Sequence, residues 1–158
     1  MSSPTWLRGA DLDQLSTAAR RTRRLRLNRN LHAVDDRVHR LLNAIEPGSY
    51  VRPHRHLDPP KTETVVVVRG SLGLVLFDES GVVAESVLLR AEPSGTFGAD
   101  VPPGAIHSFV SLERGTVFFE VKEGPYVAPS GGDLPAWAPA EGEAAATAFE
   151  VSLRALFG

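Results

Sequence analysis

A succession of short apolar stretches fills the middle of the chain. Within residues 48–127 these stretches are separated by turns that contain glycine, proline or aspartate, and they read TETVVVVRG, SLGLVLFD, GVVAESVLL, IHSFVSL and TVFFEVKE. No helical spacing lies between them, and strands this short, joined by turns, are typical of an antiparallel sandwich or barrel. Residues 93–104 are rich in glycine and proline, so we expect a loop there.

The pattern before residue 48 is mixed. Residues 12–20 predict a short helix. Residues 35–45 predict a second one, because four apolar residues in this stretch follow the i, i+3, i+4, i+7 spacing of one helix face: Val38, Leu41, Leu42 and Ile45. This interpretation places His39 on an exposed helical surface. Pro47 and the glycine after it would end the helix.

Between the two predicted helices, the stretch RLRLNRNLH alternates between leucine and polar residues. A period of two predicts a strand with one polar face. Asn28, Asn30 and His32 share that face, and we expect them to lie at a cavity mouth or against a partner subunit rather than in open solvent.

The last part of the chain, residues 128–158, predicts a connector rich in proline, glycine and alanine, followed by a helix. Its expected apolar stripe is Ala145, Ala148, Phe149, Leu153 and Leu156. We therefore expect a single domain in three parts: helices and an edge strand over residues 1–47, a barrel over residues 48–127, and a connector and helix over residues 128–158.

Composition limits the function. The chain has 158 residues, 42% hydrophobic and 23% charged, which is ordinary for one globular domain. A net charge of −2 gives no overall attraction to nucleic acid or anionic membranes, and the arginines of residues 20–26 have no aromatic platform beside them. No cysteine is present, which excludes thiolate ligands and disulfides. Without a long apolar segment or a signal-peptide core, we expect a cytoplasmic protein.

Three of the five histidines and one glutamate suggest a metal site. His54 and His56 are two residues apart, so on an extended segment their imidazoles share a face. Glu63 opens the valine-rich stretch, where a buried carboxylate is costly unless it is paired or bound to a metal. His107 begins a later strand. Three imidazoles and a carboxylate can hold one divalent ion, such as Zn, Fe(II) or Mn, with positions left open for substrate.

The spacing of these residues resembles the two cupin motifs. The first motif is matched by Gly48, His54, His56, Glu63 and Gly70, and the second by Pro102, Gly104 and His107. One departure is the six residues between His56 and Glu63, where three or four are usual. That longer loop could move Glu63 away and leave a three-histidine site. The resemblance implies a mainly β, jelly-roll cupin with helices at both ends and one bound metal.

Further segments resemble the WbuC family of small cupin-fold metalloproteins, over roughly residues 20–145. The matching segments are NLH, RLLNA, PGSYVRPHRH, KTE, RG, FDESG, PPGAIHS, FFEVKEGPY and WAPAEG. That family occurs among genes for surface-polysaccharide (O-antigen) synthesis. The resemblance implies a small-molecule substrate, a sugar or sugar nucleotide that can be anionic.

Charged and polar residues near the predicted ligands are candidates for catalysis and binding. Lys61 shares the parity of Glu63 and can be an acid–base group or a solvated loop lysine. Glu120 interrupts an apolar strand and can be a catalytic carboxylate, a partner of a histidine ligand or an edge-strand charge. Tyr50 and Arg52 share the parity of His54, and Arg52 can bind an anionic substrate or form a structural ion pair. With these, the candidate substrate-binding residues are Tyr50, Arg52, Asn30 and His32.

Two classes of function are compatible with these residues. One is an enzyme: a metal-dependent isomerase or epimerase, or an iron(II) dioxygenase. The other is a metal-assisted binding module without turnover. We also expect a homodimer, because cupins commonly pair through sheet edges and an unpaired edge favours association.

Overall fold

Two antiparallel sheets form the centre of the protein. The structure is a computed structural model that describes residues 3–92 and 94–158. The described residues form a five-stranded sheet in the order β1-β2-β8-β3-β6 and a three-stranded sheet in the order β5-β4-β7. The strand bounds are β1 Arg26–Asn30, β2 Val38–Ile45, β3 Glu63–Arg69, β4 Ser71–Phe77, β5 Val83–Arg90, β6 Gly98–Val101, β7 Ile106–Ser111 and β8 Thr116–Glu123.

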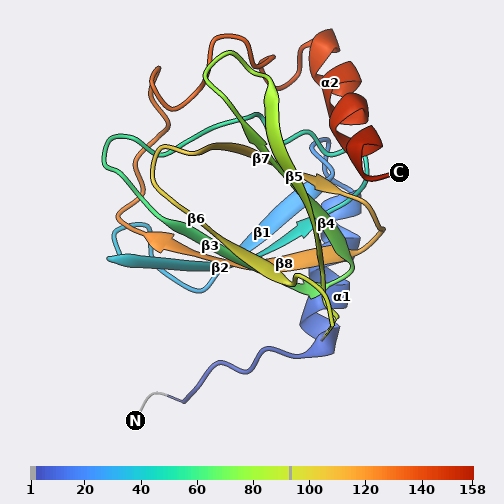
Figure 1. Ribbon diagram of the computed structural model, residues 1–158. Helices are drawn as coiled ribbons and strands as arrows, with labels where there is room; N and C mark the ends of the chain where they lie inside the picture. The colour runs from blue at the N-terminus through green and yellow to red at the C-terminus, as the bar shows by residue number, and fades with distance from the viewer. Residues whose placement is uncertain (1–2, 93) are drawn as a thin grey trace.

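The two sheets face each other across the main hydrophobic core (Figure 1). Val65 and Phe118 from the larger sheet pack with Leu72, Leu89 and Phe109 from the smaller one. All of these side chains are buried, because alternate residues of every strand point into the space between the sheets. This arrangement confirms the predicted mainly β, jelly-roll fold.

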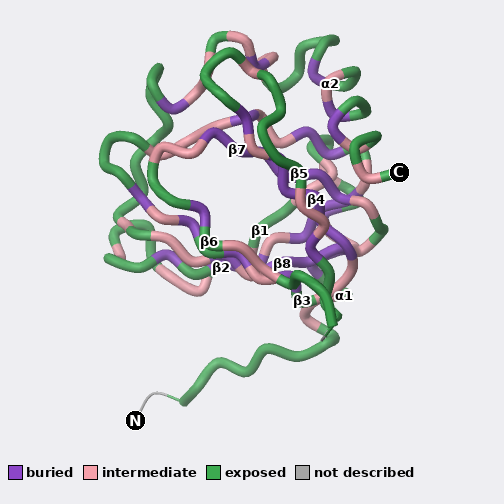
Figure 2. The backbone as a smooth tube through the Cα atoms, in the orientation of Figure 1, coloured by how far each residue is buried: buried purple, intermediate pink, exposed green. Residues whose placement is uncertain are grey.

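Helices cover the outer faces of the sheets. α1 (Gly9–Arg20) packs Leu15 and Ala19 on Leu42, Ala44 and Val117 of the larger sheet. On the smaller sheet, the second apolar cluster outside the main core joins β4 and β7 to α2 (Ala144–Arg154) and to the short helix η1 (Ala155–Phe157). Figure 2 shows the result: buried segments concentrate in the strands, and the segment before α1 is exposed. The helix predicted at residues 12–20 is confirmed as α1.

The helix predicted at residues 35–45 is wrong, because this segment is strand β2. Leu42 and Ala44 face outward under α1, while Leu41, Asn43 and Ile45 face inward. A strand with apolar residues on both faces can show the same spacing of apolar residues as an amphipathic helix. Only the elements that pack against the segment distinguish a strand from a helix. His39, expected on an exposed helix, is buried on this strand.

Two other expectations need correction. The predicted loop at 93–104 contains strand β6, which pairs with the edge of β3 between Glu63↔Val101 and Val66↔Gly98; residue 93 itself lies outside the described residues. The C-terminal helix is present, but its buried side chains are Ala146, Glu150 and Leu153 rather than the full predicted stripe. Phe149 packs beside the cluster, and the other three stripe members, Ala145, Ala148 and Leu156, are exposed.

The strand predicted within RLRLNRNLH is confirmed as β1, which forms one edge of the larger sheet. Its polar positions Asn28 and Asn30 lie opposite Asn43 and Leu41 of β2. Among the described residues, no helix is long and apolar enough to cross a bilayer.

Candidate metal centre

A single backbone bridge brings His54 and His107 together. His54 N–H donates to the His107 carbonyl at 3.0 Å, and His107 N–H donates back to the His54 carbonyl at 2.9 Å. His54 therefore sits on an extended segment that pairs with the start of strand β7, and the two imidazole rings lie 4.4 Å apart between centroids. The proline and glycine before β7 allow the chain to reverse there, since Gly104 has a positive φ of 81°.

Backbone carbonyls orient both rings. The Nδ1 atom of His54 lies 3.0 Å from the Arg52 carbonyl, and the Nδ1 atom of His107 lies 2.9 Å from the Ala105 carbonyl. Because a carbonyl only accepts, each Nδ1 carries the proton, and each Nε2 presents its lone pair to the interior. This is the arrangement by which proteins fix the tautomer of a metal-binding histidine.

The loop before Glu63 folds back on itself. Leu57 and Pro60 form an isolated antiparallel bridge, and Leu57 N–H donates to the Asp133 carboxylate at 2.9 Å. This turn takes up the extra length between His56 and Glu63, so the carboxylate of Glu63 is not displaced. The Glu63 side chain is 2% exposed and lies 3.0 Å from His56 Nε2 and 3.8 Å from His107 Nε2.

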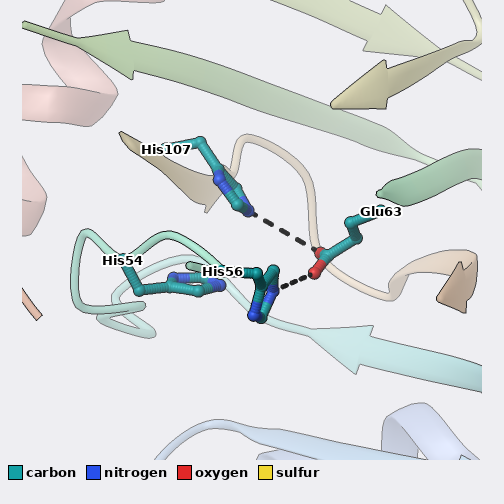
Figure 3. A group of neighbouring side chains, drawn as sticks. All are labelled: His54, His56, Glu63 and His107. Carbon is teal, nitrogen blue, oxygen red and sulfur yellow. Dashed lines mark hydrogen bonds and ion pairs between the residues drawn. The ribbon is translucent and has the colours of Figure 1, made fainter. Parts of the chain in front are cut away.

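The four side chains point toward one centre (Figure 3). One ligand atom from each of His54, His56, Glu63 and His107 lies within 4.8 Å of the others, so the group could hold a metal ion. A separate observation fits this group: His107 Nε2 is buried and accepts no hydrogen bond within the described part of the chain. Buried polar atoms rarely lack a partner, and a coordinated cation would supply one. A ligand set of three imidazole nitrogens and one carboxylate oxygen suits zinc, iron or manganese.

The protonation states also suit a cation. Burial, followed by the neighbouring His107, lowers the pKa of His54 to about 3, so its imidazole is neutral at neutral pH. Burial alone would raise the pKa of Glu63, but His107, His56 and the Lys122 ammonium together hold the pKa of Glu63 well below its usual range. Metal ligands must be deprotonated, and these two groups already are.

A second carboxylate and a lysine extend the cluster along β8. Lys122 Nζ lies 3.3 Å from Glu63 and 2.5 Å from Glu120, and Asn43 donates its side-chain amide to Glu120 at 2.7 Å. Burial and the charge of Glu63 raise the pKa of Glu120. Burial opposes the charge on Lys122, but both carboxylates outweigh it and raise the pKa of Lys122.

Three cavities adjoin this cluster. The inner chamber, about 340 Å³, is lined by His54, Glu63, Glu120 and Lys122 and by apolar core residues. Its polar lining also includes Thr22, Arg24, Arg26, Asn28 and Asn43. The outer chamber, about 400 Å³, lies over β1 and β2 and shares the Glu120–Lys122 wall. A third, smaller chamber of about 170 Å³ reaches His54 and His56 from the loops at residues 58–61 and 126–129.

The predicted catalytic residues lie on these walls. Glu120 lines the inner and outer chambers. Lys61 lines the small chamber, where its Nζ donates to the Pro125 carbonyl at 2.7 Å, and burial followed by the charge of Lys122 lowers the pKa of Lys61. Two residues of this network, Lys122 and Asn43, are not among the residues predicted from the sequence. Lys122 shares the parity of Glu120 and could have been found from it, whereas Asn43 was assigned to a helix.

The predicted substrate-binding residues separate into two groups. Asn30 and His32 line the outer chamber, next to Asn28. Tyr50 is not brought to the cluster: its hydroxyl donates to the Pro139 carbonyl at 2.8 Å, and its ring meets Phe149 edge-on. Arg52 contributes its carbonyl to His54, and its own Nε is buried without a hydrogen-bond partner among residues 3–92 and 94–158.

Comparison with known proteins identifies the fold. A family model described as "Domain of unknown function (DUF6016)" matches residues 7–89. No curated protein matches the chain. Three solved structures with similar folds are an oxalate oxidase in complex with the substrate analogue glycolate (19% identity, 65% of this chain, 52% of that chain, TM-score 0.50), an oxalate decarboxylase variant from Bacillus subtilis (19%, 68%, 27%, 0.50) and KdgF from Halomonas sp. (17%, 62%, 77%, 0.49).

The likeness to the oxalate oxidase and the oxalate decarboxylase shows that the chain has the cupin fold. The chain spans about half of the oxidase chain and about a quarter of the decarboxylase chain. At 19% identity the likeness is one of fold, and the chemistry has to be argued from the side chains of this chain.

Proposed function

We propose that this chain, which belongs to the family described as Domain of unknown function (DUF6016), is a mononuclear metal-dependent enzyme that isomerises or epimerises a small sugar or sugar-nucleotide-like molecule. One observation carries the proposal: the candidate metal ligands His54 and Glu63 line the same chamber as the Glu120–Lys122 pair. The resemblance to the WbuC family supports a role in surface-polysaccharide metabolism.

His54, His56, Glu63 and His107 would hold the ion. When bound there, a divalent cation supplies Lewis acidity to a carbonyl or hydroxyl oxygen. An isomerase also needs a group that takes a proton from one carbon and returns it to another position. Glu120 suits this task, because burial and the charge of Glu63 raise the pKa of its carboxyl above the usual range, which makes the carboxylate a stronger base.

The neighbours of Glu120 orient it. Asn43 donates to one carboxylate oxygen, and Lys122 contacts the other. Lys122 also pairs with Glu63, so it keeps two buried carboxylates in one fixed arrangement. Lys61, on the wall of the small chamber, is the second candidate for proton transfer.

The test combines three measurements on the purified protein. Elemental analysis is expected to find about one zinc or manganese per chain, and an oxygen electrode is expected to record no uptake. In D2O, sugar nucleotides are to be screened by NMR for deuterium incorporation at carbon. Iron with oxygen uptake would favour the dioxygenase, and metal with no exchange on any sugar would favour a binding module.

Glu120→Gln should slow this exchange by about 100-fold or more, because an amide cannot accept the substrate proton. The amide preserves the shape of the side chain and its bond to Asn43, and Glu120 is not a candidate ligand, so the metal content should not change. Glu79→Gln is a matched control, because Glu79 is an exposed carboxylate whose partner is Arg55. Exchange at the wild-type rate in Glu120→Gln would remove Glu120 from the mechanism.

We also propose that the protein is a homodimer. The outer strands β1 and β6 of one sheet and β5 and β7 of the other each leave an edge that no described strand covers. Open edges favour association with a second copy. Sedimentation equilibrium is expected to give twice the chain mass of 17.0 kDa; monomer alone at high micromolar concentration would contradict the proposal.

A further inference from the structure

The outer chamber collects a distinctive set of side chains. The sequence contains asparagine at three positions, Asn28, Asn30 and Asn43, and all three line this chamber. Asn28 and Asn43 also border the inner chamber, whereas Asn30 lines only the outer of the two. They come from two neighbouring strands, where Asn28 and Asn43 are directly paired in the β1–β2 register. Asparagine is uncommon in strands, so the concentration of every asparagine on one short stretch of sheet calls for a reason other than strand stability.

The amides have hydrogen-bonding capacity left over. Asn28 donates to the Asn30 oxygen at 2.6 Å, and Asn43 donates to Glu120. These bonds leave the Asn30 NH₂ group and the Oδ1 atoms of Asn28 and Asn43 without a protein partner in the described part of the chain. The chamber therefore presents both a donor and acceptors, which match a hydroxyl group because a hydroxyl also does both.

An aromatic ring completes the wall. Tyr126 is 61% exposed and lines the outer chamber from the loop after β8. The imidazoles of His32 and His39, stacked with centroids 4.0 Å apart, line the same chamber as the amides. A flat exposed ring beside neutral polar groups suits a ligand with one apolar face and hydroxyls at its edge, which describes a pyranose.

The cations at the chamber are already paired with carboxylates. Arg24 is bound to Glu141 at 2.7 Å, and Lys122 is bound to Glu63 and Glu120. An unpaired arginine fork, the usual partner of phosphate, is therefore not offered by these two residues. The chamber favours a neutral hydroxylated group over an anion.

We propose that the outer chamber is a glycosyl subsite, which holds a neutral, hydroxyl-rich ring of the substrate with Asn28, Asn30, Asn43 and Tyr126. This inference rests on the proposed function for the identity of the reacting end, which would lie at the metal centre across the Glu120–Lys122 wall. Each chamber alone reaches the lower part of the roughly 300–1,000 Å³ typical of ligand pockets. The substrate would then be a molecule of two linked parts.

The side-chain amides give a direct readout. The chain has one glutamine, Gln14, which is exposed on α1, so the NH₂ region of a ¹⁵N spectrum holds the three asparagines and one internal control. Metal-loaded protein is to be titrated with the methyl glycosides of glucose, galactose and mannose. At least one is expected to shift all three asparagine signals together and leave Gln14 unmoved, and Asn30→Ala or Tyr126→Ala should weaken that binding at least tenfold. Phe97→Ala, which removes another exposed ring, should not change it.

The same titration with the His54→Ala/His107→Ala double variant separates the two proposals. The outer chamber is not lined by either histidine, so the shifts should persist without metal even if the enzyme proposal fails. Inorganic phosphate and glycolate serve as anion probes in this metal-free variant and should not move the asparagine signals. The subsite is overturned if none of the three glycosides shifts them, if the anions do so instead, or if both chamber variants bind the glycoside as the wild type does.

Discussion

Replacing His107 with alanine is expected to abolish stoichiometric metal binding. Loss of a group that merely supports a ligand already lowers metal affinity by about 10–100-fold, so loss of a ligand itself should lower it by about 100-fold or more. His107 is 1% exposed, and its Nε2 has no hydrogen-bond partner in residues 3–92 and 94–158. Isothermal titration with zinc and elemental analysis after dialysis measure the effect.

The controls separate a lost ligand from a damaged fold. The bridge between residues 54 and 107 is made by backbone atoms, so alanine keeps it and circular dichroism should be unchanged. His32→Ala, which removes an imidazole from the outer chamber, should bind the full amount of metal. Glu63→Ala should weaken binding less than His107→Ala if the three imidazoles carry most of the affinity. Full occupancy in the His54→Ala/His107→Ala double variant would place the ion elsewhere.

The metal cluster could be anticipated from sequence because its geometry is mostly local. Two histidines two residues apart share a face of any extended segment, whatever lies around it. The longer loop before Glu63 was harder to interpret, since its outcome depends on the Leu57–Pro60 bridge and on Asp133, which is 76 residues from Leu57 along the chain. Spacing along the chain carries no information about such a contact.

Strand β2 shows where periodicity fails. A surface helix and a strand buried on both faces can carry the same order of apolar residues, and segment 38–45 is covered by α1 on one side and by the barrel interior on the other. This wrong assignment also affected the prediction of the site. The helix assignment separated Asn43 and His39 from strand β1. Their position on the same chamber wall as Asn28 and Asn30 could therefore not be predicted.

The polar network in the barrel interior depends on strand pairing. Glu63 lies beside Lys122 in the β3–β8 register, and Leu41 beside Glu120 in the β2–β8 register. Parity in FFEVKE places Glu120 and Lys122 on one face, but it does not say that this face points inward. A half-buried lysine between two buried carboxylates follows only when all three strands are assembled.

That lysine gives the prediction with the largest effect on stability. Lys122→Met should destabilise the metal-free protein by about 3–5 kcal/mol, the usual cost of removing one partner from a buried charge cluster. Glu63 and Glu120, which are 2% and 8% exposed as side chains, would face each other without a cation between them. Urea unfolding followed by tryptophan fluorescence measures the loss.

Bound metal and a lower pH should each reduce the stability that Lys122→Met loses, because each compensates a carboxylate charge at this site. A cation bound at Glu63 would replace one of the charges that Lys122 supplies, so the deficit should be smaller in metal-loaded protein. Without lysine, the folded-state pKa of Glu120 rises further above its unfolded value. At pH values below the unfolded-state pKa of Glu120 the variant keeps its stability, and it loses stability as the pH rises through the folded-state pKa. The difference in unfolding free energy between variant and wild type should therefore shrink as the pH falls toward about 5.

Lys61→Met is the matched control, because Lys61 is a buried lysine that donates to the Pro125 carbonyl rather than to a carboxylate. It loses one hydrogen bond without stranding a carboxylate, and about 1 kcal/mol is expected. If the two variants lose equal stability, or if metal leaves the Lys122→Met deficit unchanged, the lysine does not act as the counter-charge of the carboxylates. If metal reduces the stability loss in Lys122→Met and not in Lys61→Met, Lys122 interacts with Glu63 and, through Glu63, with the bound ion.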